Sequence, residues 1–271
     1  MKINNGFYEL MDNYDATIFF DTETTGTNAE GKDELGQQIQ IVELAARRLE
    51  KDKSGQLHIT RSMDDFIKMP EGCKLPPSIV EFNRKHSTGI DDKLLETHGK
   101  TEAEACAKFE ELTKGNVLLV AYNAQFDLCM VREMLARSGE DKELMDKNDV
   151  LDPLTILKSI KPYSLNETKC KKEYPNLEPS QLSGHRLETA LLYYHIEDEF
   201  QNSHRAIDDC DALIGVTQQV CKTKGQYKQW INVIGYNPKY SLQGKHHPRV
   251  KYFGQYYLWK SKNLQQISSY T

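Results

Sequence analysis

The sequence lacks the features that mark membrane and secreted proteins. It has no apolar run close to the ~18 residues that a membrane-spanning helix needs. Acidic residues, among them Asp12 and Asp15, interrupt the amino terminus, so the profile of a signal peptide is missing. We therefore expect a cytoplasmic protein without a membrane partner.

Cysteine is sparse and scattered. The six cysteines form no C-x-x-C pair, and none has a histidine at the spacing of a zinc ligand set. This pattern argues against both a zinc site and a disulfide framework. We expect reduced thiols with mostly structural roles at the six positions, which are Cys73, Cys106, Cys129, Cys170, Cys210 and Cys221.

Acidic residues are absent from the last part of the chain. Residues 222–271 contain nine Lys or Arg and no Asp or Glu, whereas the net charge of the whole chain is −5, so residues 1–221 carry −14. The same segment contains ten interleaved aromatic residues: Tyr227, Trp230, Tyr236, Tyr240, Tyr252, Phe253, Tyr256, Tyr257, Trp259 and Tyr270. Two interpretations are open. The segment could stack bases and contact phosphates, or its aromatics could pack a small extension onto an acidic body.

Length and composition predict one sizeable core. The chain has 271 residues, of which 38% are hydrophobic and 28% are charged. From the change in charge we predict a body over residues 1–221 and a basic, aromatic extension over residues 222–271.

Hydrophobic periodicity predicts an α/β fold. Three successive strands at 17–20, 40–46 and 57–61 have connections that favour an antiparallel meander. Further along we expect strands at 117–122 and 150–152 and helices at 101–114, 127–138, 187–195 and 206–222, with a short helix opening at Pro76-Pro77. We also consider a strand at 252–259 and a turn at Asn237-Pro238. A mixed sheet flanked by helices results.

Two carboxylates one residue apart follow the first predicted strand. Asp21 and Glu23 lie in the run Asp-Thr-Glu-Thr-Thr that ends at Thr25. In a strand, residues two apart share a face, so both carboxylates can converge on one hard cation while Thr22 points away. Alone, this motif could equally be an acidic turn at the end of a strand.

Three more residues lie at the starts of predicted helices. Asp127 follows the strand at 117–122, and His204 and Asp209 flank the start of the last helix of the body. Individually, a helix-terminal carboxylate or a surface histidine would explain them.

Together these residues resemble the DEDDh branch of the DnaQ-like 3′-to-5′ exonucleases, the family of the proofreading epsilon subunit of bacterial DNA polymerase III. The match includes Asp21 and Glu23, then Asp127, then His204 with Asp209, in order and context. Flanking segments agree: Leu75-Pro76-Pro77-Ser78-Ile79 before His86-Ser87-Thr88-Gly89-Ile90, and Leu187-Glu188-Thr189-Ala190 before His204-Arg205-Ala206. The resemblance covers roughly residues 15 to 221 and implies a ribonuclease H-like sheet.

Helix geometry bears on the last motif. Residues five apart on a helix are about 140° off a common face, so His204 and Asp209 can share a site only if His204 precedes the helix. Asp208 is the competitor, because it would face a helical His204. The family pattern favours Asp209 and leaves Asp208 and Asp211 as solvent or supporting groups.

The resemblance implies metal-dependent hydrolysis of phosphodiesters with release of 5′-mononucleotides from a 3′ end. Two Mg²⁺ or Mn²⁺ ions would be held by the four carboxylates, with Asp21 bridging and Asp127 acting through water, and His204 would be the general base. The backbone around Thr24 and Thr25 would lie near the terminal nucleotide.

The expected partner is the 3′ end of a single-stranded nucleic acid, with DNA favoured. An exoribonuclease is an alternative, because readout of the 2′-hydroxyl depends on pocket shape. A nucleic-acid-binding module and a subunit associated with a DNA polymerase are further alternatives. The loop from Thr27 to Gln38 is longer than the family's usual link between its first two strands. The sequence therefore does not determine how a substrate would pass this loop.

Overall fold

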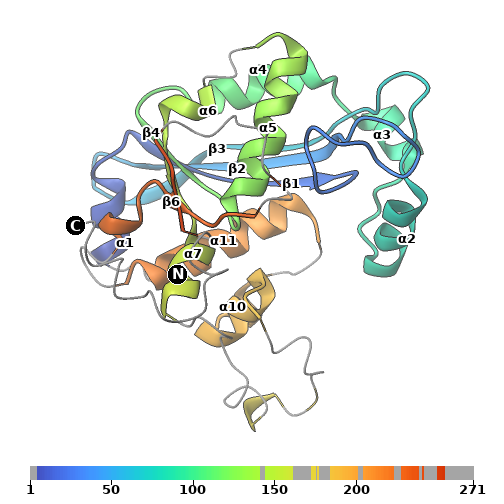
Figure 1. Ribbon diagram of the computed structural model, residues 1–271. Coiled ribbons are helices and arrows are strands. Elements are labelled where there is room, and N and C mark those ends of the chain that lie inside the picture. The colour runs from blue at the N-terminus through green and yellow to red at the C-terminus, as the bar shows by residue number, and fades with distance from the viewer. Residues whose placement is uncertain are drawn as a thin grey trace.

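A five-stranded mixed sheet runs through the centre of the molecule (Figure 1). The computed structural model describes residues 5–140, 144–160, 172–174, 176, 184–200, 204–222, 227–237, 240 and 249–253. The strand order is β3-β2-β1-β4-β5. The strands are β1 (Ala16–Thr24), β2 (Ile41–Lys51), β3 (Leu57–Phe66), β4 (Val117–Val120) and β5 (Asp149–Leu151). Strands β1, β2 and β3 pair antiparallel, while β4 and β5 continue the sheet in parallel with β1, so the predicted fold class is confirmed.

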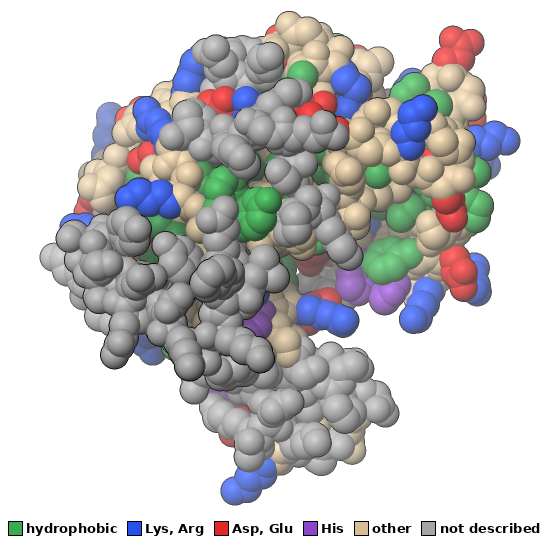
Figure 2. Space-filling view, in the orientation of Figure 1, with side chains coloured by type: hydrophobic (Ala, Val, Ile, Leu, Met, Phe, Trp, Pro, Cys, Tyr) green, Lys and Arg blue, Asp and Glu red, His purple; other side chains and the backbone are tan. Residues whose placement is uncertain are grey.

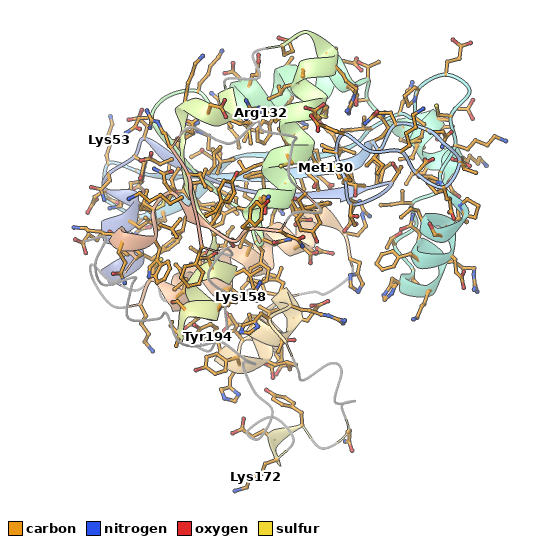
Figure 3. The ribbon with its side chains drawn as sticks, in the orientation of Figure 1. Lys53, Met130, Arg132, Lys158, Lys172 and Tyr194 are labelled. Carbon is orange, nitrogen blue, oxygen red and sulfur yellow. The ribbon has the colours of Figure 1, made fainter. Side chains whose placement is uncertain are left out.

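Helices cover both faces of this sheet (Figure 1). One face carries α4 (Glu102–Leu112), α5 (Ala124–Ser138) and α6 (Leu144–Lys147). The other carries α1 (Asn5–Met11), α7 (Pro153–Ile160), α10 (Leu187–Tyr194) and α11 (Ala206–Val220). Figure 3 places Lys158 of α7 and Tyr194 of α10 on the α11 side, and Arg132 of α5 on the opposite side, where its guanidinium lies 3.1 Å from Asp146 of α6.

Alternation along β1 builds the two halves of the core. Ile18 and Phe20 pack under α4 and α5, whereas Phe19 packs toward α11. All four residues of β4 are buried, as expected for a strand covered on both faces. The same alternation sends Asp21 and Glu23 to the α11 side and Thr22 to the α5 side at the end of the strand.

Local sequence signals mark the ends of several helices. Thr101 and Glu104 form the reciprocal capping box of α4, and Gly139 ends α5 in the left-handed conformation (φ 75°). Pro77 is the first residue of α2 (Pro77–His86). Sequence analysis did not identify α1, α3 (Asp92–His98), α6 or α7, which have four to eight residues each, although it did predict α10, which has eight.

Helices α2 and α3 lie beyond one end of the sheet (Figure 1). Val42 and Leu75 form a separate small core with Ile90 and Leu95 of this region. The long loop after β1 lies alongside it, because Gln37 exchanges two hydrogen bonds of 2.8 Å with the backbone of Lys74. The loop at 27–38 is therefore folded onto the segment that leads into α2.

The described part of the extension lies along the outer edge of β5. It contains a 3-10 turn, η2 (Lys228–Trp230), and two short strands, β6 (Val233–Ile234) and β7 (Lys251–Tyr252). Asn232 donates its N–H to the Val150 carbonyl at 2.7 Å and accepts the Val150 N–H on its side chain at 2.9 Å. This contact covers an edge that would otherwise be open.

Aromatic residues of the extension serve packing where the structure describes them. Tyr227, Trp230 and Phe253 are buried in the α11-side core. Tyr240 meets Phe126 edge to face at 5.2 Å. For these residues the packing interpretation holds. The aromatics at 256, 257, 259 and 270, the rest of the strand considered at 252–259, and Pro238 of the considered turn lie outside the described residues.

Two further expectations can be compared with the described residues. Five of the six cysteines fall within them and all five are free thiols, while Cys170 lies outside. In the same part of the chain, no helix combines the length and the apolar character that crossing a membrane requires.

Candidate active site

Three carboxylates meet where β1 passes the start of α11. Asp21 and Glu23 come from β1 and Asp209 comes from the first turn of α11. One oxygen of each lies within 4.8 Å of an oxygen of the others. All three are partly accessible to solvent, so a ligand can reach them. Their convergence agrees with the shared strand face predicted for Asp21 and Glu23.

His204 and Asp209 flank the start of α11. His204 precedes the helix in a left-handed conformation (φ 50°), Arg205 is extended, and the helix begins at Ala206. The geometric condition for a shared site is therefore met. Asp209, not Asp208, belongs to the three-carboxylate group. Asp211 instead receives two hydrogen bonds from Arg47, at 2.9 and 2.8 Å.

Asp127 reaches the same edge from the opposite face of the sheet. It lies in the first turn of α5, is 2% exposed, and accepts a 2.7 Å hydrogen bond from the Thr22 hydroxyl. Asn123 holds the left-handed turn before the helix (φ 65°), and its N–H donates to the buried Asp152. Asp127 is not within the three-carboxylate group, yet its charge acts on Asp21.

Burial and mutual repulsion disfavour ionisation of this cluster. Burial, then the charges of Asp127 and Asp209, hold the pKa of Asp21 well above its usual range. Burial, followed by Asp209, raises the pKa of Glu23 to about 8. Burial also raises the pKa of Asp127 and of Asp209 to about 7 each. An added positive charge would stabilise the ionised forms.

The donor set fits a hard divalent cation. Carboxylate oxygens are the ligands that Mg²⁺ and Mn²⁺ prefer, and such sites favour convergent anionic oxygens at the edge of a sheet. Here three of them converge from two elements, and a fourth carboxylate lies close enough to add its field.

Glu43 is a part of this region that the sequence analysis missed. It lies directly opposite Glu23 in the β1–β2 register and is fully buried. Arg205 contacts its Oε1 through Nε and Nη2, both at 2.8 Å, and the N–H of Ala206 donates to Oε2 at 3.2 Å. The pair joins β2 to the start of α11, between His204 and Asp209 in the chain. The sequence did carry a signal for this pair, because Glu43 is the single charged residue in the apolar run at 41–46.

The two threonines expected near the substrate close the turn after β1. Thr24 donates its hydroxyl to the Gly26 carbonyl at 2.7 Å. Thr25 is buried and exchanges hydrogen bonds with the Gln40 backbone, both at 2.9 Å. A register shift between Glu23 and Thr24 turns the strand at this point. Both side chains are thus used internally, and a backbone role toward substrate stays a prediction.

Comparison with known proteins agrees with this arrangement. A family model described as an exonuclease, RNase_T, matches residues 18–217. The chain belongs to this exonuclease family. The resemblance to the DnaQ-like DEDDh superfamily seen in the sequence is thereby confirmed.

Curated relatives are similar over part of their length. The DNA polymerase III PolC-type of Clostridium perfringens is 27% identical over 236 residues, which cover 87% of this chain and 13% of that protein. The ribonuclease T of Photorhabdus laumondii is 32% identical over 130 residues, which cover 45% of this chain and 54% of that protein. Most of the chain thus matches a small part of PolC, and less than half of it matches about half of ribonuclease T.

Solved structures share the fold at lower identity. Exonuclease I of E. coli in complex with a dT13 oligonucleotide superposes with a TM-score of 0.56 and 22% identity, over 76% of this chain and 40% of that one. The nuclease domain of 3'hExo, described as a DEDDh family member bound to rAMP, gives a TM-score of 0.53 and 13% identity, over 78% and 96%. These matches support the ribonuclease H-like fold.

Proposed function

We propose that the chain is a metal-dependent 3′-to-5′ exonuclease that releases 5′-mononucleotides, with DNA favoured over RNA. The observation that carries the proposal is the convergence of Asp21, Glu23 and Asp209, with Asp127 adjacent and His204 placed before α11. Membership in the exonuclease family supports a nuclease. The direction, the substrate and the roles of the individual residues belong to the proposal.

The four carboxylates would hold two Mg²⁺ or Mn²⁺ ions, in which Asp21 contributes to both sites. When bound, such ions supply a reactive nucleophile near neutral pH and stabilise charge on the leaving oxygen. Asp127 is fixed by Thr22 and so offers a preorganised carboxylate on the α5 side. Because the pKa values of Glu23 and Asp209 are raised, protons compete with cations for these carboxylates at acidic pH. We therefore expect cation binding near or above neutral pH.

His204 would accept the proton of the attacking water. The oxygen of that water forms a bond to phosphorus, the bond from phosphorus to the 3′-oxygen breaks, and the 3′-oxygen leaves with a proton from solvent. Burial lowers the pKa of His204, and the charge of His86 lowers it further, so the neutral form that a base needs persists below neutral pH.

Two observations bear on the substrate and the biological setting. The similarity to a PolC-type polymerase spans most of this chain and favours DNA and a link to a DNA polymerase. The similarity to ribonuclease T favours the alternative, an exoribonuclease. We propose residues 1–221 as the exonuclease domain and residues 222–271 as an extension that supports it.

Degradation of labelled single strands tests this function. The protein would be incubated with 5′-labelled DNA and RNA of matched sequence in Mg²⁺, Mn²⁺ or EDTA, and products resolved by length. We expect a metal-dependent ladder that shortens from the 3′ end, with DNA degraded faster.

The Asp21→Ala variant should produce no ladder, and the Glu96→Ala variant, which changes an exposed carboxylate of α3, should match the parent protein. A ladder from RNA alone would favour the exoribonuclease. No shortening of either strand in any metal would contradict the proposal and favour a binding module or a polymerase-associated subunit.

A further inference from the structure

Two aromatic side chains of α2 pack against His204. His86 is the last residue of α2, and its ring centroid lies 4.3 Å from that of His204 with an interplanar angle of 77°. Phe82, four residues earlier and therefore on the same side of α2, lies 5.6 Å from His204 and 4.3 Å from His86. Figure 2 shows histidine side chains gathered beside a hydrophobic side chain on this part of the surface.

These rings are the contacts that fix the His204 side chain. Among the described residues, no hydrogen bond reaches either ring nitrogen of His204, whereas the bases of many hydrolases are oriented by a carboxylate. Its backbone lies in the left-handed region (φ 50°), and the next residue, Arg205, is hydrogen-bonded to Glu43. The imidazole is therefore set by its backbone on one side and by α2 on the other.

We propose that His86 is a positioning residue for the His204 base, holding the His204 imidazole through the contact between the two rings. Across that contact, a proton on His86 also disfavours a proton on His204. This inference rests on the proposed function, because it assigns His204 the role of base. It gives α2, which contributes no carboxylate to the cluster, a part in the reaction.

The charges around His204 explain the second half of the proposal. Two imidazoles in contact repel each other when both are protonated, so a proton on one disfavours a proton on the other. His204 also faces Glu188 of α10, which favours its charged form, and Arg186, which disfavours it. His86 and Arg186 thus oppose Glu188, and burial adds to their effect.

Two substitutions separate packing from charge. His86→Phe keeps a ring against His204 and removes the titratable imidazole of His86, whereas His86→Ala removes both. His98→Phe is the matched control, since His98 is an exposed histidine at the end of α3. The kcat of each variant would be measured against pH with saturating Mg²⁺.

For His86→Phe we expect the rate at alkaline pH to stay within about twofold of the parent and the acidic limb to move to higher pH. For His86→Ala we expect the same shift and a plateau lower by about tenfold, because the imidazole is no longer held. His98→Phe should reproduce the parent profile. Parental profiles in both His86 variants would overturn the proposal.

NMR titration of His204 provides a readout that does not need activity. Its ring signal would be assigned by its loss in His204→Gln and followed with pH in Mg²⁺-loaded protein. In His86→Phe the titration should move to higher pH, and an unmoved titration would overturn the proposal. If the parent protein degrades no nucleic acid while the titration still moves, the exonuclease function fails and the contact between the two histidines stands.

Discussion

Carboxylates at the two ends of the parallel strands have pKa values that are shifted in opposite directions. Near the start of β5, Asp149 accepts hydrogen bonds from Asn232, Tyr14 and Arg249, at 2.8, 3.0 and 3.1 Å. Burial alone would raise its pKa, but these donors hold the pKa below its usual range. At the end of β1, burial and neighbouring carboxylates hold the pKa of Asp21 well above it.

This difference in pKa distinguishes a carboxylate that stabilises the fold from carboxylates that are arranged to bind a ligand. Asp149 is satisfied by the extension, which contributes Asn232 and Arg249, so the fold is complete there without a ligand. The carboxylates at the other end repel one another and so favour a bound cation. Repulsion retained in a folded protein is typical of sites whose ligand supplies the missing charge.

The largest expected effect is the loss of nuclease activity when a carboxylate of the three-carboxylate group is replaced. Asp209→Asn removes one of the three converging carboxylates, and kcat should fall by roughly a thousandfold or more. Asp208→Asn is the matched control, because it changes the adjacent carboxylate that lies outside the cluster, and its rate should stay within about tenfold. The reverse ranking in the DNA degradation assay would mean that Asp208 is the ligand.

His204→Ala should have the next largest effect, lowering kcat by roughly a hundredfold or more. His204 is not one of the three converging carboxylates, so the His204→Ala variant should still bind Mn²⁺, as measured by calorimetry. Loss of Mn²⁺ binding together with activity would show instead that His204 maintains the cluster.

A smaller effect concerns stability and pH. The pKa values of about 8 for Glu23 and about 7 for Asp127 and Asp209 exceed those of about 4 in an unfolded chain. Between those limits the folded state binds more protons than the unfolded state, so stability should fall as pH rises from about 4 to about 8. In EDTA we therefore expect a Tm several degrees lower at pH 8 than at pH 6.

Mg²⁺ should raise the Tm more at pH 8 than at pH 6, since it binds the ionised carboxylates. In the Asp209→Asn variant the fall of Tm with pH in EDTA should be shallower. Equal slopes in the variant and the parent would show that the cluster does not govern the pH dependence.

The sequence predicted the carboxylate-bearing end of the sheet better than the opposite one. Strand alternation placed Asp21 and Glu23 together, and helix geometry required His204 to precede α11, as the structure shows. The Glu43–Arg205 pair and the ring contact of His86 join residues 162 and 118 positions apart, and no local period predicts such contacts. Likewise, Tyr227 and Trp230 are buried in the α11-side core, which only the assembled fold presents.

The smallest expected effects follow from changes around Asp149, whose carboxylate already accepts three hydrogen bonds. Arg249→Ala removes a half-exposed partner of Asp149 and should cost little, whereas Asp149→Asn also weakens the contacts with Tyr14 and Asn232 and should cost about 1 kcal/mol of unfolding free energy. Because the pKa of Asp149 is lowered in the folded state, its contribution is present above the unfolded pKa and is lost as pH falls through the folded one. The cost measured by urea unfolding should thus be larger at pH 7 than at pH 3, the opposite sign to the carboxylate cluster. DNA degradation should be unchanged in both variants, and a large loss of activity in Asp149→Asn would mean that the two ends of the sheet are coupled.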